Sequence, residues 1–594
     1  MNTLQQICSG TNFYNYQRHL ISASAIPLLL AVILTSCSQR LLPYNKEEGK
    51  QSGSDHIRVN QIGYYPKATK QAVIVTDEQK ANFQVVNQAN KVVLSGLLSA
   101  PQQWDLSGEN VQIADFSTVT KPGTYFLLVE DMGRSHSFEI RKRVLEEAYL
   151  GSIKGMYYQR MSTALEEQHA GKWHREMAHP DDRVLYHPSS GKSEGFRVAP
   201  KGWYDAGDYN KYVVNGSFPI GQFLLLEEQY PGTVKDNVLN IPESGNGQSD
   251  YLDELKYELD WLLSMQDDDG GLFHKLTAKS FEGMVMPKEA TSQRYIVGKG
   301  TAATLDFAAA TAKAYRIYQP TQDDFAQQCL EASKQAYEWA KKNPEVVYRN
   351  PEDVVTGEYG DEDFEDEWTW ANAELFIATQ DKSYLEVIQS DTLDFTFKAG
   401  ESWTGFMRFL GYFALLENEA LLPSDFYQTL KEGILNEANR LVGLSQTLPY
   451  FQPVDDFHWG SNSDILNAAM ILAQAYRLDQ KPQYLQAVQQ SVDYIFGTNA
   501  VGYSFLTGFG DRTPMFIHHR QSAADDIAEP VPGLLSGGPN SRQQDAKDGT
   551  VYPENAPPMK SWVDQGPSYA SNEICLNWNA PLTYILGFLE QESK

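Results

Sequence analysis

Two aspartates lie close together in the stretch GWYDAGDYNKY, residues 202–212. Only Ala-Gly separates Asp205 from Asp208, and the glycines at 202 and 207 favour a tight loop over a helix interior. Paired carboxylates in such a loop can take a proton from water, which is the chemistry of glycosidic-bond hydrolysis. Spacing alone leaves two other interpretations open, a solvated turn and a calcium loop.

Aromatic residues surround this pair, and a distant glutamate completes the set. We interpret the aromatics as one wall of a groove on which uncharged sugar rings stack: Trp203, Tyr204, Tyr209 and Tyr212. Glu573 is the candidate acid that protonates the leaving oxygen. Its neighbours Tyr569 and Ile574 are expected to raise its pKa by desolvation. The sequence therefore predicts a base and an acid on separate segments.

Two later loops contain further candidates. Residues 504–520, SFLTGFGDRTPMFIHHR, end in His518-His519-Arg520, and residues 562–580, WVDQGPSYASNEICLNWNA, hold Asp564 and Glu573. His518 also fits a simpler explanation, a loop histidine whose hydrogen bonds are satisfied within the protein. Long loops rich in aromatic and acidic residues are where function is expected.

A helical framework is predicted to carry these loops. In residues 251–266, the leucines at 252, 255, 259, 262 and 263 fall on one helical face. Further helices are predicted at 300–318, 366–380, 463–478 and 482–497. Such segments recur between 146 and 590. They predict an α/α toroid, in which helix hairpins close into a barrel and the loops at one end form a cleft.

In the chain before this framework, the apolar residues follow the spacing of strands rather than that of helices. Between 56 and 142, seven short stretches with strand patterning are separated by turn signals such as Asn90-Lys91 and Pro122-Gly123. This spacing predicts an immunoglobulin-like β-sandwich. No cluster of catalytic residue types stands out there, so we predict a structural module.

Composition narrows the class of ligand. The 594 residues carry a formal charge of −28, with a sequence pI of about 4.8. Such a chain repels nucleic acid and anionic membranes, so a neutral or cationic ligand is favoured. Cys329 and Cys575, in apolar contexts, form neither a disulfide framework nor a metal-binding pair.

The N-terminus is predicted to be a targeting segment. Residues 1–36 hold a short apolar run that ends in Leu34-Thr35-Ser36 before Cys37, as in a bacterial lipoprotein signal. A plain secretory signal with an incidental cysteine is the alternative. We expect Cys37 to carry lipid and residues 37–55 to be a flexible tether. The expected location is the cell envelope, in the outer membrane and facing the periplasm or the surface, with membrane contact only through the lipid.

Several long motifs resemble glycoside hydrolase family 9, the inverting β-1,4-glucanases, in the subgroup with an N-terminal immunoglobulin-like domain. Residues 504–520 match its histidine signature at Ser504, Leu506, Thr507, Gly510, Arg512, Ile517, His518 and Arg520. Residues 562–580 match its acid signature at Trp562, Asp564, Tyr569, Glu573, Asn579 and Ala580. Cys575 departs from the small Ser, Thr or Ala usual there. RVNQIGYYP, GEYGDEDFEDEWTW and FHWGSNSDILNAA also look like the family.

The resemblance implies a mainly α fold, an (α/α)6 toroid over 146–590 preceded by a small sandwich over 56–142. It implies that Asp208 is the general base, that Asp205 holds the same water, and that Glu573 is the general acid. His518 is expected near the scissile bond, and Asp564 is expected to orient sugar hydroxyls or neighbouring groups. The expected substrate-binding residues are Arg520, Tyr204 and Tyr569.

The resemblance also bears on metals. No cofactor is expected for catalysis. A structural calcium near Asp363, Asp366 and Glu367 is one interpretation, and a solvated acidic loop capping the next helix is the other. Zinc is not expected, because Met161 and Ala178 stand where related sequences carry cysteines, and His179 alone cannot hold it.

The sequence thus predicts a monomeric, lipid-anchored endo-β-1,4-glucanase acting on cellulose-like chains, mixed-linkage glucan or xyloglucan. An exo-acting β-glucosidase or glucosaminidase of the same fold is the first alternative. A non-catalytic glycan-binding surface lipoprotein is the second, although such a protein has no need for a base and an acid.

Overall fold

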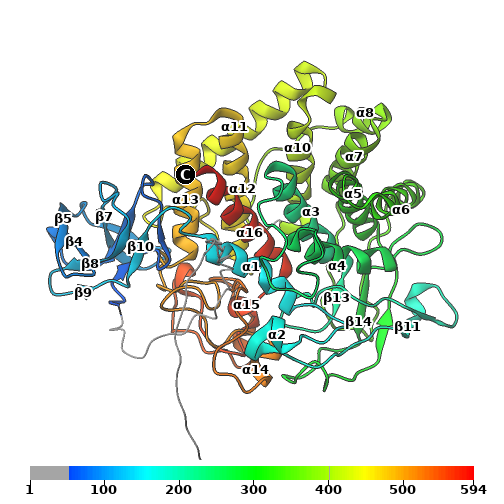
Figure 1. Ribbon diagram of the computed structural model, residues 1–594, viewed down its shortest axis with the longest axis horizontal. Coiled ribbons are helices and arrows are strands. Elements are labelled where there is room, and N and C mark those ends of the chain that lie inside the picture. Colours follow the sequence, from blue (N-terminus) through cyan, green and yellow to red (C-terminus); the bar gives the residue numbers. More distant parts are fainter. Residues whose placement is uncertain (1–52, 401, 594) are drawn as a thin grey trace, which may run out of the picture. The chain divides into compact units, whose positions relative to one another are not determined.

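The structure is a computed structural model that describes residues 53–400 and 402–593. The predicted signal segment, Cys37 and most of the predicted tether lie outside the described residues. Within these two ranges, no helix combines the length and the apolar character needed to cross a membrane. A β-sandwich and a helical barrel follow one another along the described chain (Figure 1).

The β-sandwich is built from two sheets with strand orders β1-β3-β7-β6 and β2-β10-β8-β4-β5, and β9 pairs with β8. Alternate residues of β8 are buried, namely Tyr125, Leu127 and Val129, as expected for a strand with one face on the core. Each of the seven predicted stretches contains a strand. The strands are β1 (Ile57–Arg58), β2 (Gly63–Tyr64), β3 (Gln71–Val75), β4 (Asn82–Asn87), β5 (Val92–Leu97), β6 (Gln102–Trp104), β7 (Glu109–Asp115), β8 (Gly123–Val129), β9 (Gly133–Arg134) and β10 (Phe138–Ile140).

The barrel alternates inner and outer helices along the chain. The inner helices are α3 (Val213–Gln229), α5 (Thr301–Tyr318), α7 (Glu365–Thr379), α10 (Met407–Glu417), α12 (Ser461–Asp479) and α16 (Leu576–Glu592). The outer helices are α1 (Glu146–Tyr158), α4 (Asp250–Ser264), α6 (Asp323–Lys342), α8 (Lys382–Ser390), α11 (Ser424–Thr447) and α13 (Pro482–Ile495). Contacts link α3, α5, α7 and α10 in one row, and α12, α16 and α3 in another.

Burial explains which helices are inside. In α5, nearly every residue from Thr301 to Ala314 is buried, and its many alanines let neighbouring helices approach closely. By contrast, α6 buries one face and leaves charged residues on the other. A helix apolar on all sides belongs inside and an amphipathic one outside. The predicted helices at 251–266, 300–318, 366–380, 463–478 and 482–497 correspond to α4, α5, α7, α12 and α13.

A small sheet inside the helical domain was not predicted. It has the order β12-β11-β15-β14-β13. Its strands are β11 (Val184–Tyr186), β12 (Phe196–Arg197), β13 (Lys211–Tyr212), β14 (Lys275–Ala278) and β15 (Arg294–Ile296). Strands this short show no detectable alternation, which is why the sequence pattern misses them. Because β13 immediately precedes α3, this sheet fixes the end of the aspartate loop.

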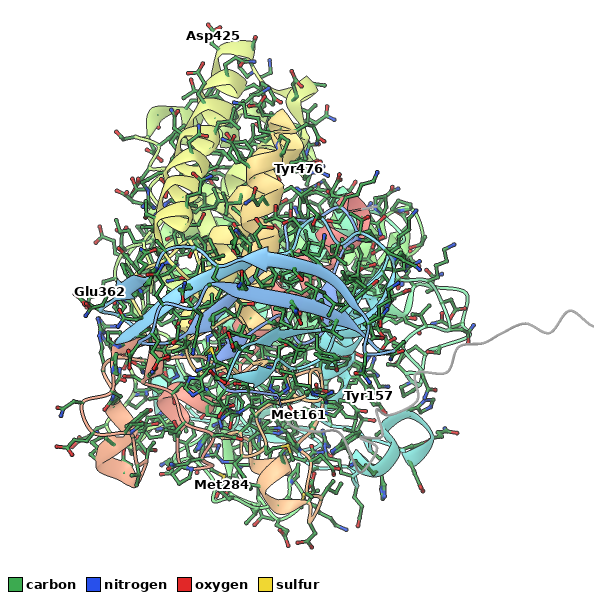
Figure 2. All side chains as sticks on the ribbon, turned by 90° about the vertical axis from the view of Figure 1, so that its left-hand side faces the viewer. Tyr157, Met161, Met284, Glu362, Asp425 and Tyr476 are labelled. Carbon is green, nitrogen blue, oxygen red and sulfur yellow. The ribbon has the colours of Figure 1, made fainter. Side chains whose placement is uncertain are left out.

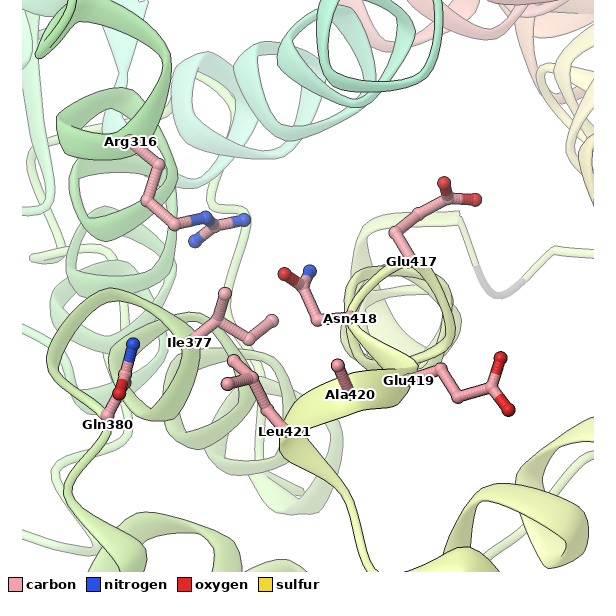
Figure 3. Close-up of a pocket in the computed structure, with 8 residues that line it drawn as sticks. All are labelled: Arg316, Ile377, Gln380, Glu417, Asn418, Glu419, Ala420 and Leu421. Atoms are coloured by element: carbon pink, nitrogen blue, oxygen red, sulfur yellow. The ribbon is translucent and has the colours of Figure 1, made fainter.

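An open pocket of about 750 Å³ lies at the C-terminal ends of α5, α7 and α10 (Figure 3). Each inner helix is followed by an outer helix that runs back, so all inner helices point in the same direction. The pocket, at their C-terminal ends, therefore lies at the opposite end of the barrel from their N-terminal ends. Arg316 points into the pocket, but its guanidinium is bound by Glu228 and Glu374. The pocket is therefore separate from the predicted aspartates, which precede α3.

Candidate active site

The aspartate loop is attached to the start of α16. Leu576 N donates to Asp205 O (3.0 Å), and residue 206 forms an antiparallel bridge with residue 575. At Gly207, a Cβ atom would lie 2.0 Å from the carbonyl oxygen of His518, so only glycine allows this approach. The loop therefore brings the two aspartates to the N-terminal ends of α3 and α16.

Both aspartate side chains are held by amide and phenol donors. Asn210 Nδ2 (2.5 Å) and Tyr212 OH (3.2 Å) donate to Oδ2 of Asp208. For Asp205, Asn215 Nδ2 donates to Oδ1 (2.6 Å). Asp205 Oδ2 accepts from Tyr359 OH (2.8 Å). The aspartates are only 3% and 4% exposed, so these donors fix two nearly dry carboxylates.

The surroundings of Asp205 raise its pKa well above its usual range. Burial is the largest cause, and the negative charge of Asp208 is the second. Hydrogen bonds from Asn215 and Tyr359 and the positive charge of Lys275 act in the opposite direction. Burial and the neighbouring charge together favour the protonated form of Asp205.

Glu573 meets the aspartate loop at Gly207, whose N–H donates to Glu573 Oε1 (3.3 Å). Although part of Glu573 remains exposed, burial of its carboxyl raises its pKa well above the usual range, and the charge of Asp208 raises it further. A raised pKa favours the protonated form of a carboxyl group, which is the form that can act as an acid. Gly207 thus joins the predicted base loop to the predicted acid.

His518 pairs with Glu573 in a short parallel bridge. Its Nδ1 lies 2.7 Å from the carbonyl oxygen of Gly566. Because a carbonyl only accepts, Nδ1 carries the proton of the neutral ring and Nε2 is an acceptor. Burial lowers the pKa of His518 to about 4, which favours this neutral form. An acceptor nitrogen beside the acid suits a sugar hydroxyl.

Asp564 holds the backbone around this histidine. Its carboxylate accepts from the N–H groups of Met515 (3.0 and 2.8 Å) and Phe516 (2.8 Å). It also accepts from Asn572 Nδ2 (3.1 Å), next to Glu573. Of the two roles expected for Asp564, these contacts fit the orientation of neighbouring groups.

Arg520 connects the aspartate loop to the loop that follows β14. Its Nη1 donates to Gly207 O (2.8 Å) and its Nε to Glu282 O (2.9 Å). The guanidinium carbon lies 5.5 Å from the ring centroid of Phe281. Arg520 is buried, and these bonds make it a positioning group for Gly207. Its predicted contact with sugar hydroxyls stays a prediction.

Exposed aromatic side chains lie beside this constellation. The rings of Tyr569 and Trp459 are 5.4 Å apart, and Tyr569 is 5.9 Å from the His518 ring. Trp459 is 42% exposed, Phe281 48% and Phe516 63%. Large exposed apolar groups next to buried acids suit a ligand with flat, uncharged faces.

Comparison with known proteins decides the family. Residues 146–586 match Glycosyl hydrolase family 9, and residues 52–134 match the cellulase N-terminal ig-like domain. The chain belongs to glycosyl hydrolase family 9. This confirms the predicted fold, an (α/α)6 barrel preceded by an immunoglobulin-like sandwich, and the prediction that the protein is a glycoside hydrolase.

Several relatives within family 9 are similar over most of their length. A xyloglucan-specific endo-β-1,4-glucanase of Bacteroides ovatus is 40% identical over 565 residues, which cover 90% of this chain and 94% of that protein. Endoglucanase D of Acetivibrio thermocellus is 34% identical over 590 residues, which cover 96% and 87%. The solved structure of a Bacteroides ovatus GH9 protein matches with a TM-score of 0.84 at 37% identity, covering 91% of this chain and 100% of that one.

Tyr204, a predicted substrate-binding residue of this family 9 enzyme, is not accessible at the surface. It is only 1% exposed, and its hydroxyl bonds to His179 Nδ1 (2.8 Å). Trp203, Tyr209 and Tyr212 are buried as well. The aromatic residues around the aspartates therefore belong to the buried core. The prediction that they form a wall on which sugar rings stack is wrong. Residue type alone could not tell which side of the loop they occupy.

The residues considered above as a zinc position are engaged in other contacts. His179 Nε2 bonds to Ala290 O (2.9 Å), so both ring nitrogens are engaged by protein groups. Met161 is fully buried there, and Met284, on the same loop as Ala290, lies at the surface (Figure 2). These residues do not fit a zinc ion, which needs several thiolate or imidazole ligands.

A cluster of buried acids lies at the start of α7. Asp366 and Glu367 open this helix, Asp306 comes from α5, and Asp361 precedes α7. Each has at least one buried carboxylate oxygen without a hydrogen-bond partner. Burial raises the pKa of all four, and for Asp306, Asp361 and Glu367 the charge of neighbouring acids of the cluster adds to the increase. By contrast, the predicted ligand Asp363 is exposed.

Sequence reasoning missed the donors that hold the aspartates. Asn210 and Tyr212 lie within the quoted loop, and Asn215 follows in the first turn of α3. Tyr359 comes from GEYGDEDFEDEWTW and has a left-handed φ of 48°. Asparagine and tyrosine are common residues, so residue type alone does not mark these four side chains as donors to the aspartates. The strained backbone that aims Tyr359 is visible only in the structure.

Proposed function

We propose that this enzyme hydrolyses internal β-1,4-glucosidic bonds of plant-type β-glucans with inversion of the anomeric configuration. The observation that supports this most is the arrangement around Gly207, where a buried aspartate pair and a glutamate with a raised pKa lie on either side of one peptide unit. A raised pKa suits Glu573 to the role of the acid, and the aspartates on the other side of the peptide unit are left for the water.

The chemistry then follows from the residues. Asp208 takes a proton from a water molecule as that water attacks the anomeric carbon, and Asp205 holds the same water. Glu573 gives its proton to the leaving oxygen. Each turnover leaves Asp208 protonated and Glu573 ionised, so one proton returns between them through solvent. His518 Nε2 accepts from a sugar hydroxyl.

Xyloglucan, mixed-linkage glucan and cellulose-like chains are the proposed substrates. Similarity to a xyloglucan-specific relative favours xyloglucan for the first trial. Viscosity should fall steeply at low release of reducing ends if cleavage is internal. Release of monomer without loss of viscosity would instead indicate the exo-acting β-glucosidase or glucosaminidase, and binding without any hydrolysis would indicate a glycan-binding lipoprotein.

We also propose that the buried acid cluster binds a structural calcium. Calcium is held by carboxylate oxygens, and six buried oxygens of these four acids lack hydrogen bonds. No three acidic, histidine or cysteine side chains between residues 53 and 593, residue 401 aside, are already arranged as a metal site. Binding would therefore draw Asp306, Asp361, Asp366 and Glu367 together.

Calcium should raise the thermal midpoint by a few degrees over that in EDTA, because a ligand at about 100 times its Kd adds roughly 2.7 kcal/mol. In EDTA the raised carboxyl pKa values stabilise the fold at low pH, and this stability is lost as the pH rises through about 6, the pKa of Asp361. Asp306→Asn should stabilise the EDTA form and abolish the calcium response. The control Asp363→Asn should change neither, and an unchanged midpoint with calcium would contradict the proposal.

Lipid anchoring remains a proposal carried by Leu34–Cys37. Cys37→Ala should remove labelling by a radioactive fatty acid and release the protein from the membrane fraction, or leave it unprocessed. Cys329→Ala is the matched control, because that cysteine is buried in the barrel. A Cys37→Ala protein that stayed labelled and membrane-bound would contradict the lipoprotein interpretation.

A further inference from the structure

A buried lysine lies behind the two aspartates and has no part in the chemistry proposed above. Lys275 begins β14 and pairs with Tyr212 of β13. It is fully buried, and its Nζ donates to Asn350 Oδ1 (2.8 Å), Thr356 Oγ1 (3.0 Å) and Gly357 O (2.6 Å). These bonds use all three ammonium donors, so the charge has a fixed position.

The partners of Lys275 are neutral. Among the described residues no carboxylate lies within 4.0 Å of its Nζ, whereas buried Lys211 has Asp181 at 2.9 Å. Burying an ammonium group without a paired anion is costly. Burial lowers the pKa of Lys275 to about 7, so the lysine is charged on the acidic side of neutrality, and the compensating charges lie farther away, on Asp208, Glu358 and Asp205. The lysine therefore interacts with the aspartate pair through space.

Two routes, one through a cation–π contact and one through hydrogen bonds, also lead from Lys275 toward Asp208. The first is Tyr212, whose ring centroid is 5.3 Å from Nζ and whose hydroxyl donates to Asp208. The second begins at Thr356, which bonds Thr277 (2.7 Å). Thr277 Oγ1 in turn donates to Asn210 Oδ1 (3.1 Å), and Asn210 donates to Asp208.

A third connection leads to Asp205. The segment that Lys275 holds by Asn350, Thr356 and Gly357 continues directly into Tyr359. Because Tyr359 has a left-handed backbone conformation, the chain before it must be held firmly for its hydroxyl to reach Asp205. Lys275 is thus connected to both members of the pair.

We propose that Lys275 is a positioning residue for glycoside hydrolysis, whose positive charge favours the ionised state of the Asp205–Asp208 pair and leaves Glu573 protonated. The charge acts on one side of the site, since the cation that acts on Glu573 is Arg520. This arrangement separates the base from the acid electrostatically. The proposal rests on the roles proposed for Asp208 and Glu573.

Other ionisable groups also face the pair, and they come from every element packed around it. They are Tyr212 of β13, Glu258 of α4, Tyr359 before α7, and Glu573 and Cys575 before α16. Those around Lys275 are Tyr212, His274, Tyr348 and Glu358. Lys275 is the cation of this group that favours ionisation of Asp205.

The test is the pH dependence of kcat/KM for the full chain. Ionisation of the base governs the acidic limb, so Lys275→Met should move that limb upward by on the order of one pH unit. At a pH on the limb, this is roughly a tenfold loss, whereas the basic limb should stay in place. Lys275→Gln removes the charge but keeps amide donors, and the same shift is expected.

Thr356→Val is the matched control, because it removes one hydrogen bond of Lys275 and keeps its charge. We expect it to lower kcat equally at every pH, without moving the acidic limb. If both Lys275 variants fold, judged by circular dichroism, but leave the limb unmoved, the proposal is wrong. If Lys275→Met does not fold, Lys275→Gln decides. A wrong assignment of the catalytic roles would give a different result, because Asp208→Ala would then keep its activity.

Discussion

Asp208→Ala is expected to lower kcat on a β-glucan by on the order of 10²–10⁴-fold, the contribution of a positioned general base. The KM should change little, because Asp208 is buried and bonded to Asn210 and Tyr212 at the base of the loop. The matched control is Asp182→Ala, an exposed aspartate, which should leave kcat unchanged. Near-normal activity in Asp208→Ala would remove it from the base role.

Glu573→Gln should lose a similar factor for natural glucans but much less for an aryl glycoside, whose leaving group needs little protonation. The basic limb of the pH profile should also disappear, because activity requires protonated Glu573 and its raised pKa extends activity to higher pH. Asp208→Ala should show neither the aryl rescue nor the loss of that limb. Equal losses on both substrates would contradict the acid role.

Stereochemistry tests the same assignment without a variant. If a water molecule attacks directly, proton NMR of fresh product should show the α-anomer before mutarotation. The β-anomer appearing first would mean a covalent intermediate and would make Asp208 or Asp205 a nucleophile.

Parts of the site with a strong local pattern could be predicted from the sequence. The aspartate loop has two acids and two glycines within seven residues, and the helices repeat their apolar residues with a helical period. The family resemblance joined Glu573 to this loop across more than 350 positions. The bridge at residues 206 and 575 is the physical basis of that connection.

Features that depend on long-range packing could not be predicted. Tyr204 belongs to the right loop, but its burial depends on His179 and on a later loop that holds Ala290. Asp306 is a single acidic residue within α5 and matches no recognisable sequence motif. It comes near Glu367 only because α5 and α7 pack together. Lys275 lies in a strand of four residues, too short to be recognised.

Removal of the β-sandwich is the second change with a large expected effect. Deleting residues up to 142 should lower the thermal midpoint by about 10 °C or more, or prevent folding, although every proposed catalytic residue remains. The reason is the loss of a shared core, because each kcal/mol of lost stability lowers the midpoint of a large domain by about 2–4 °C. Tyr65, Val73 and Val111 belong to the same apolar cluster as the barrel. Differential scanning calorimetry of both forms measures the loss.

Polar contacts across this interface would be left unpaired as well. Asp493 of α13 accepts from Asn60 (2.8 Å), and Glu590 of α16 accepts from Tyr65 (2.7 Å). Burial already raises the pKa of Asp493 to about 8. Removing a partner from a buried polar group costs about 1–3 kcal/mol for each group that stays buried. The loss therefore exceeds that of apolar contact alone.

One residue of the sandwich connects stability to the site. Gln61 Nε2 donates to Gly502 O (3.0 Å), and Gln61 Oε1 accepts from Arg512 N (2.8 Å), so it holds the segment that continues to His518. Gln61→Ala should lower both the thermal midpoint and kcat, whereas Gln88→Ala, an exposed glutamine of the sandwich, should change neither. A truncated protein that folded normally but hydrolysed nothing would mean that the sandwich acts on the site directly, through this segment. Full stability and activity after truncation would instead show that the shared core is dispensable, because the barrel would then be stable without the sandwich packed against it.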